Sequence, residues 1–242
     1  MLCGGFLKND SVLVTGPSGS GKTTLGMEFL YKGAHLFDEP GLFISFEELP
    51  EKIQQYSVGF GWNLKKLETQ DCLRIICTSP SVFLEQIKTP ENLFDQIIEE
   101  LGVKRVFIDG LRALELEIPN VSRQRKMVYC ILNHFTRSLK TTTMLSYEIP
   151  SLFGFPKTIS HSGVDFLADC IIVLIHTKRG TELGKAIIVL KMRGSDHDKS
   201  IKHVMIGRDG LEVQAKLEVS ENLLEDLSTL PLKHPIERKI EI

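Results

Sequence analysis

Short apolar runs alternate with longer segments of helical periodicity along most of the chain. The runs are rich in β-branched and other apolar residues, which is typical of strands buried on both faces of a parallel sheet. The alternation predicts an α/β fold with a mainly parallel twisted sheet flanked by helices. The predicted strands are residues 11–16, 41–47, 73–78, 105–110 and 141–147.

Helical periodicity is clearest in three segments. The first covers residues 22–35, and the second, residues 91–101, repeats apolar side chains every three or four positions. The third carries an apolar stripe over residues 127–139, and Ser122 is its predicted N-cap. Such stripes are what helices packed on a sheet require.

The pattern changes after Asp169. Three apolar runs follow, at residues 170–180, 184–194 and 200–210, separated by charged or glycine-containing turns. They are predicted to be antiparallel strands that extend the sheet. We therefore expect one domain over residues 1–216. Residues 217–242, with mixed charges and two prolines, are expected to form a C-terminal extension that is either docked or partly mobile.

Composition agrees with a single globular domain, since 42% of the 242 residues are apolar. The formal net charge of −2 neither proposes nor excludes a polyanionic partner. Five cysteines without a CxxC pair are interpreted as reduced core thiols. No apolar run approaches the roughly 20 residues of a membrane helix, and the N-terminus is unlike a signal peptide. These features predict a cytoplasmic protein without a membrane partner.

The segment GPSGSGKTT matches the pattern GxxxxGK[ST] and lies between a predicted strand and a predicted helix. Its glycines allow successive backbone N–H groups to point inward at a phosphate, and the following helix adds its positive N-terminus. The alternative, a chance glycine-rich turn, is disfavoured by this context. The predicted nucleotide-binding residues are Gly16, Pro17, Ser18, Gly19, Ser20, Gly21, Lys22, Thr23 and Thr24.

This loop predicts ATP with Mg²⁺ as ligands. Lys22 is expected to neutralise β- and γ-phosphate oxygens, and the Thr23 hydroxyl is expected to bind Mg²⁺. Asp109 ends an apolar strand at the edge where ligands bind in open α/β sheets, so it is a second candidate metal ligand. An aspartate that caps a turn is the alternative interpretation.

Two further motifs have weaker signals of their own. Glu47 and Glu48 end the second strand, where one of them could orient or deprotonate the attacking water, or both could simply open a helix. Lys191 and Arg193 point to the same face of a strand and could clamp an anion. From the residues alone, a solvated strand edge is the favoured interpretation of this second pair.

Together and in this order, GPSGSGKTT, ISFEE, VFIDG and KMRGSDHDKSI resemble the KaiC-like branch of the RecA superfamily, over nearly the whole chain to about Gly210. The resemblance implies a RecA-type core, a hexameric ring and ATP bound between neighbouring subunits. It implies that the glutamate pair activates the hydrolytic water. It also implies that Lys191, Arg193 and His197 reach the phosphates of the next subunit, and that Ser146 and Glu148 sense the γ-phosphate.

The chain also departs from the pattern of this family. The clock protein has two tandem ATPase domains, and its autophosphorylated Ser-Thr pair aligns here with Asp165 and Phe166, so autokinase activity is not expected. The usual lead before the double glycine is shorter here, because the chain starts almost at Gly4 and Gly5. A truncated N-terminus is therefore expected.

Three functions remain open at this point. The first is a ring-forming ATPase that acts on an unknown protein partner. The second is a RecA- or RadA-like module in which residues such as Arg123, Arg125, Phe153, Phe155 and Lys157 contact single-stranded DNA, although interleaved acidic residues disfavour it. The third is a regulator that binds nucleotide without hydrolysing it, which the intact set of candidate catalytic residues disfavours.

Overall fold

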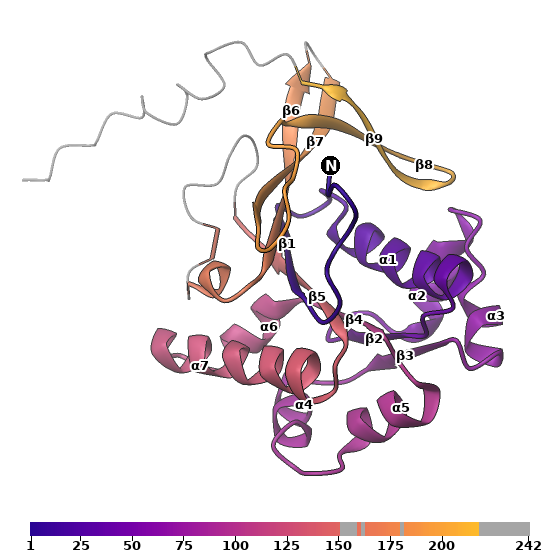
Figure 1. Ribbon diagram of the computed structural model, residues 1–242, viewed down its shortest axis with the longest axis vertical. Coiled ribbons are helices and arrows are strands. Elements are labelled where there is room, and N and C mark those ends of the chain that lie inside the picture. The colour runs from indigo at the N-terminus through magenta and orange to yellow at the C-terminus, as the bar shows by residue number, and fades with distance from the viewer. Residues whose placement is uncertain (151–158, 161–162, 180–181, 218–242) are drawn as a thin grey trace, which may run out of the picture.

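The computed structural model describes residues 1–150, 159–160, 163–179 and 182–217. In this part of the chain one nine-stranded sheet has the order β3-β2-β4-β5-β1-β6-β7-β8-β9 (Figure 1). The strands are β1 (Ser11–Gly16), β2 (Gly41–Ser45), β3 (Leu73–Cys77), β4 (Arg105–Asp109), β5 (Thr142–Glu148), β6 (Cys170–Arg179), β7 (Glu182–Met192), β8 (Lys202–Gly207) and β9 (Gly210–Lys216).

The strands β1 to β6 are parallel to one another, whereas β7, β8 and β9 continue the sheet from β6 in antiparallel pairs. The predicted α/β class and all five predicted parallel strands are confirmed. The expected antiparallel pairing of β6 with β7 is confirmed, and the other edge of β6 is parallel to β1. The strand β9 was not predicted, because most of its side chains are exposed and it lacks an apolar run.

Helices cover both faces of the sheet (Figure 1). Side chains on β1 alternate between the two apolar layers: Val12 and Val14 face one layer and Leu13 faces the other. The first three helices pack in the layer with Val12, and the other four pack in the layer with Leu13. The helices are α1 (Lys22–Phe37), α2 (Pro50–Val58), α3 (Leu64–Thr69), α4 (Pro80–Gln86), α5 (Leu93–Leu101), α6 (Leu111–Leu116) and α7 (Val121–Leu132).

The helix α1 approaches the sheet closely. Gly26 on α1 faces the ring of Phe107 on β4, and a Cβ at Gly26 would lie 2.2 Å from that ring. The close approach holds the N-terminus of α1 against the carboxyl ends of the central strands. It thereby places the segment between β1 and α1 at the edge of the sheet where ligands bind.

The start of α7 differs from the prediction. The helix begins at Val121, and its N-cap is Asn120, whose side chain accepts a 3.0 Å hydrogen bond from the backbone N–H of Arg123. Ser122 therefore lies in the first turn. Both residues are good caps, and the choice is decided by where the chain leaves α6. After Leu132 the helix continues as a wider π-turn, η1 (Asn133–Ser138).

The cysteines are only partly as expected. Cys170 is buried, and burial raises the pKa of its thiol to about 12. Cys3 and Cys130 are exposed, so the interpretation of the cysteines as core thiols is wrong for these two. Cys130 lies on the outward side of α7, where an apolar neighbourhood in sequence does not mean burial. No helix within the described residues is long and apolar enough to span a membrane.

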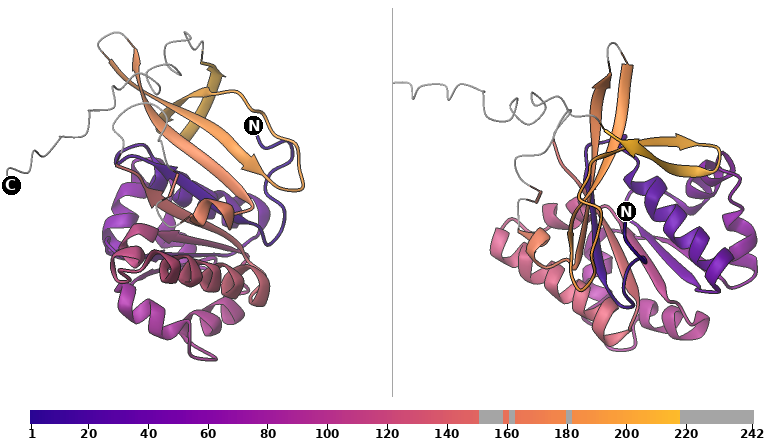
Figure 2. Two further views of the ribbon diagram at one scale, coloured as in Figure 1. Left: turned by 90° about the vertical axis from the view of Figure 1, so that its left-hand side faces the viewer. Right: turned by 45° about the horizontal axis from the view of Figure 1, so that its top comes forward.

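The two outer strands of the sheet carry charged groups. On β3 the backbone N–H of Ile75 donates a 3.1 Å hydrogen bond to the carboxylate of Glu68, which belongs to α3. On β9 the side chains of Glu212 and Lys216 are exposed. The backbone N–H of Leu211 on β9 donates a 2.8 Å hydrogen bond to Glu28 of α1, so β9 lies against this helix. Figure 2 shows β6 and β7 as long strands that rise beyond the central ones.

Candidate nucleotide-binding site

A cleft of about 710 Å³ opens at the carboxyl ends of the central parallel strands. It brings together four segments that are far apart in sequence: the loop after β1, the residues after β2, the end of β4 and the end of β5. This is the edge at which α/β sheets bind ligands. The residues that line it include Ser18, Gly19, Gly21, Lys22, Thr23, Thr24, Ser45, Glu47, Glu48, Asp109, Ser146 and Glu148.

The phosphate-binding loop joins β1 to α1. Gly21 has φ 107° immediately before the first helical residue, a backbone conformation that residues with a side chain rarely adopt. This glycine lets the chain turn sharply into α1, so the unpaired N–H groups of the first helical turn face the cleft.

Lys22 is the first residue of α1 and is 8% exposed. Its ammonium donates 2.9 Å hydrogen bonds to the backbone carbonyls of Gly16 and Pro17 and lies 3.9 Å from the carboxylate of Glu148. Burial lowers the pKa of Lys22, and the negative charges of Glu148, Asp109 and Glu47 oppose this shift. The loop therefore holds a poorly solvated cation whose partners an anionic ligand can replace.

Thr23 and Asp109 meet at the floor of the cleft. The hydroxyl of Thr23 donates a 2.6 Å hydrogen bond to Oδ2 of Asp109, and Ser146 donates to Oδ1. A hydroxyl and a carboxylate side by side are the hard oxygen ligands that Mg²⁺ prefers when it also binds phosphates. No group of three or more His, Cys, Asp or Glu side chains within the described residues is arranged as a metal site of its own.

The two glutamates are held by a residue that the sequence did not indicate. The buried hydroxyl of Ser45 accepts hydrogen bonds from the backbone N–H groups of Glu47, at 3.4 Å, and Glu48, at 2.9 Å. This turn directs the chain after β2 along the cleft, and both glutamates line it. A serine just before an acidic pair is a recognisable local turn signal.

The two carboxylates differ in environment. Glu47 is exposed, whereas Glu48 is partly buried and its Oε2 atom has no hydrogen-bond partner within the described residues. Burial raises the pKa of Glu48. Lys52 opposes this shift, and the carboxylates of Asp109 and Glu47 add to it. A raised pKa makes Glu48 a better proton acceptor than an ordinary surface glutamate.

A second unpredicted residue is Ile206 on β8, which also lines the cleft. A Cβ at Gly21 would lie 2.6 Å from its Cδ1 atom, so this side chain covers the junction between the loop and α1. Only the pairing of β8 with β7 brings it there. No signal near Ile206 in the sequence could have revealed this position.

Lys191, Arg193 and His197 do not line the cleft. The Lys191 ammonium donates to three backbone carbonyls within residues 165–168. Arg193 forms a 3.2 Å ion pair with Asp169 and remains exposed. These contacts hold the basic residues near their own turn and away from the phosphate-binding loop of the same chain.

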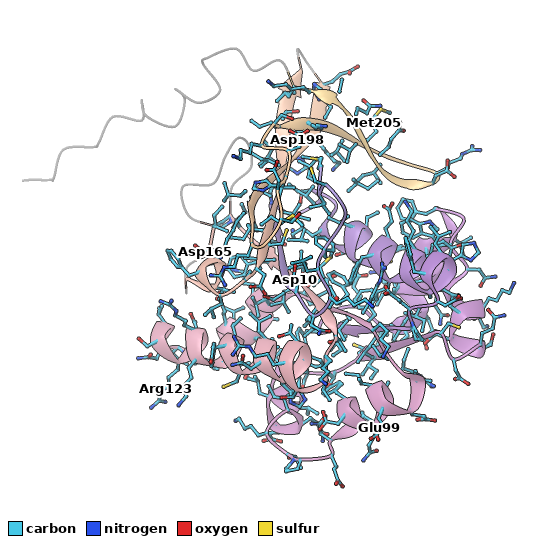
Figure 3. All side chains as sticks on the ribbon, in the orientation of Figure 1. Asp10, Glu99, Arg123, Asp165, Asp198 and Met205 are labelled. Atoms are coloured by element: carbon cyan, nitrogen blue, oxygen red, sulfur yellow. The ribbon has the colours of Figure 1, made fainter. Side chains whose placement is uncertain are left out.

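Their position follows from the direction of the strands. Because β6 runs parallel to β1 from Cys170, the end of β7 lies beside the amino end of β1, at the opposite edge of the sheet from the loop. Asp165 lies beside this start of β6 (Figure 3). Any contact of the three basic residues with a bound phosphate would therefore involve a neighbouring subunit.

A family sequence model described as ATPase: KaiC matches residues 1–218. The chain belongs to the KaiC family. The likeness to a crystal structure of a KaiC-like protein from Pyrococcus horikoshii OT3 covers 88% of this chain and 93% of that one, with 29% identity and a TM-score of 0.76. The predicted RecA-type core is thus confirmed for this KaiC-family chain.

Curated relatives agree with this assignment. The circadian clock oscillator protein KaiC of Prochlorococcus marinus (strain MIT 9313) is 30% identical over 217 residues, which cover 87% of this chain and 43% of the relative. KaiC 1 of Synechocystis sp. is 31% identical over 217 residues, covering 87% and 41%. The KaiC-family chain therefore spans less than half the length of these relatives.

These likenesses give no support to the recombinase interpretation over the KaiC one. Of the residues predicted for DNA contact, Phe153, Phe155 and Lys157 lie outside the described residues. Arg123 is exposed and points outward from α7 (Figure 3). Arg125 is also exposed, and its guanidinium lies 5.8 Å from the ring of Phe166.

Proposed function

We propose that this KaiC-family chain binds ATP with Mg²⁺ in the cleft and hydrolyses the nucleotide. One observation carries the proposal: a buried lysine, a hydroxyl–carboxylate pair and two glutamates line one cleft at the end of the phosphate-binding loop. These are the groups that phosphoryl transfer to water requires, namely a phosphate cradle, metal ligands and a residue that handles the water.

In this mechanism Lys22 exchanges its bonds to the Gly16 and Pro17 carbonyls for bonds to β- and γ-phosphate oxygens. The exchange is favourable because its ammonium is already largely desolvated in the loop. Thr23 and Asp109 would hold Mg²⁺. The ion would supply charge neutralisation for the triphosphate. Ser146 keeps the Asp109 carboxylate oriented and, with Glu148, is placed to sense the γ-phosphate.

Glu47 and Glu48 would act on the attacking water. One carboxylate would accept the proton of the water as its oxygen bonds to the γ-phosphorus and the bond from that phosphorus to the ADP leaving group breaks. The other would orient the water or help to hold the metal. The raised pKa of Glu48 and its unbonded Oε2 atom support a role as proton acceptor. The single variants Glu47→Gln and Glu48→Gln should distinguish the two roles. The variant that lacks the proton acceptor should lose ATP hydrolysis and keep its affinity for ATP.

We also propose that the chain works as a subunit of a homo-oligomeric ring, with six subunits as expected from the family. In such a ring Lys191, Arg193 and His197 would stabilise the transition state in the neighbouring subunit. Their location away from the cleft of their own chain supports action between subunits. Residues 1–216 would form the ATPase domain and residues 217–242 an extension. ATP turnover would time contacts with a cytoplasmic signalling partner.

Isothermal titration calorimetry with Mg²⁺ and ATP, followed by a phosphate-release assay, tests the proposal. Wild type should bind ATP and release phosphate. Lys22→Ala should weaken ATP affinity at least ~100-fold because two phosphate contacts of a desolvated cation are lost. Lys126→Ala, an exposed position on α7, is the matched control and should behave as wild type. ATP binding of unchanged strength in Lys22→Ala would refute the proposed site.

A further inference from the structure

The strand β6 continues past the end of β1. The two strands pair up to Thr15 and Val173, after which β1 turns into the phosphate-binding loop and β6 runs on to Arg179. A Cβ at Gly16 would lie only 2.5 Å from the carbonyl oxygen of Leu174. The free part of the β6–β7 ladder thus lies directly against the loop, and Figure 2 shows these long strands rising beyond the central sheet.

Two side chains on this ladder contact the loop. His176 on β6 and Lys185 on β7 are paired directly opposite one another, so they project from the same face. The Nε2 atom of His176 lies 3.0 Å from the carbonyl oxygen of Ser18, and the ammonium of Lys185 donates to the carbonyl of Gly19. Since a carbonyl oxygen only accepts, Nε2 of His176 carries the proton.

Both contacts reach the loop from outside the cleft. Ser18 and Gly19 line the cleft, but His176 and Lys185 do not. In a trans peptide the C=O and the following N–H point in opposite directions. A carbonyl of Ser18 that is held toward the ladder therefore turns the N–H of Gly19 away from the ladder. The Gly19 carbonyl does the same for the N–H of Ser20, which donates a 3.2 Å hydrogen bond to the carbonyl of Pro17.

We propose that His176 and Lys185 are positioning residues that hold two peptide groups of the loop, so that the N–H of Gly19 faces a bound phosphate and the N–H of Ser20 stays on the side of the Pro17 carbonyl. The inference rests on the proposed nucleotide site and adds a part of it. A loop of small residues would otherwise sample many backbone conformations, and fixing it before the ligand arrives removes that cost from binding. His176 is 6% exposed, and burial lowers the pKa of Lys185, so both donors are partly shielded from water.

The test compares Mg²⁺–ATP affinity by calorimetry in four variants. Lys185→Met keeps the length of the side chain and removes the hydrogen-bond donor. His176→Leu replaces the imidazole ring by an apolar side chain and also removes the donor. Each should weaken ATP binding by about tenfold, the usual size of a lost hydrogen bond to a carbonyl plus the added freedom of the loop. Lys185→Arg and His176→Gln each keep a hydrogen-bond donor, so each should bind ATP with an affinity within about threefold of wild type.

The salt dependence of ATP affinity distinguishes a positioning role of Lys185 from simple attraction between its charge and the triphosphate. A long-range charge effect is largely screened at roughly 0.5 M salt, whereas the deficit from a disordered loop persists. Lys65→Met, an exposed position on α3, is the control for removing one positive charge and should bind ATP like wild type. Persistence of the Lys185→Met deficit at high salt, together with rescue by Lys185→Arg, supports the proposal.

Three results would overturn it: wild-type affinity in both Lys185→Met and His176→Leu, tenfold weaker binding in both Lys185→Arg and His176→Gln, or a Lys185→Met deficit that disappears at high salt. If His176→Leu does not fold, the Lys185 pair and His176→Gln still decide the outcome. Wild type without any ATP binding would refute the nucleotide site itself, and this inference with it. ATP binding by wild type with unaffected variants would refute the positioning role alone.

Discussion

Thr23 and Asp109 are 86 positions apart in the sequence, yet the Thr23 hydroxyl donates a 2.6 Å hydrogen bond to the Asp109 carboxylate. The bond joins the first turn of α1 to the end of β4 and places the two oxygens proposed to bind Mg²⁺ side by side. A bound Mg²⁺ would use this geometry without rearranging either strand or helix. The pair thus offers a direct way to test whether the metal is part of the site.

Asp109→Asn should remove most of the Mg²⁺ dependence of ATP binding, because a neutral amide oxygen is a much weaker ligand for a hard cation. Calorimetry with ATP in Mg²⁺ and in EDTA measures the difference, which should be large for wild type and small for the variant. Hydrolysis should fall by about 100-fold or more. Asp71→Asn, which changes an exposed aspartate, is the control. Equal Mg²⁺ dependence in Asp109→Asn and wild type would exclude Asp109 as a ligand.

Glu48→Gln should make the nucleotide-free protein slightly more stable at neutral pH, by about 1 to 2 °C in melting temperature. The pKa of Glu48 is higher in the folded chain than in the unfolded one, so folding disfavours its ionised form. This cost is present above the folded pKa and disappears as the pH falls through that pKa to the ordinary value of 4.5, where wild type takes up a proton on folding.

The advantage of Glu48→Gln should therefore shrink on acidification. Melting curves of both proteins between neutral and mildly acidic pH measure this change, and Glu51→Gln at an exposed site serves as the control. An advantage of Glu48→Gln that grows as the pH falls would contradict the raised pKa.

Mixing two inactive variants tests catalysis between subunits. Arg193→Ala keeps a complete cleft but lacks the arginine, whereas Lys22→Ala keeps Lys191, Arg193 and His197 but has a defective cleft, so each alone should lack hydrolysis. In a mixed ring an Arg193→Ala subunit can receive the arginine from a Lys22→Ala neighbour. An equal mixture should recover about a quarter of wild-type turnover if subunits assemble at random and one neighbour supplies the arginine.

Phosphate release from the mixture, before and after conditions that allow subunits to exchange, measures the recovery. Arg193→Ala mixed with itself gives the background. No recovery after demonstrated exchange would argue against action between subunits, and full turnover of Arg193→Ala alone would remove the arginine from the mechanism.

Gly26→Ala should destabilise the chain by about 1 to 3 kcal/mol, because the added methyl group has no room against the ring of Phe107. The loss is expected even though alanine is the better helix former. Urea unfolding followed by circular dichroism measures it. Gly207→Ala, where a Cβ would have no neighbour within 4 Å, is the control and should change stability little. Equal stability of the two variants would show that α1 can move away from β4.

The parts of this molecule that could be predicted from sequence have local signals. The loop at residues 16–24 is defined by its own glycines and lysine, and the five central strands are defined by continuous apolar runs. The gathering of Asp109 with Thr23 was predictable because parallel strands end at one edge. The family resemblance supplied the expected roles of Lys191, Arg193 and His197, which their chemistry alone left open.

The parts that could not be predicted depend on register and on chain direction. Three side chains reach the loop only through the arrangement of the strands: His176 and Lys185 because β6 extends beyond the end of β1, and Ile206 because β8 pairs with β7. The N-cap of α7 depends on where α6 releases the chain, and Asn120 and Ser122 are chemically similar choices. The strand β9 alternates polar and apolar residues at an exposed position, which local pattern does not distinguish from a loop.

The charged groups on the outer strands limit how copies of this chain can associate. At β3, a strand added by another chain would have to displace the Glu68 carboxylate from the backbone. At β9, it would have to place its backbone beside the charges of Glu212 and Lys216. Open-ended fibre growth by strand addition is thereby suppressed. Association that closes on itself and stops would then have to use surfaces other than these two strand edges.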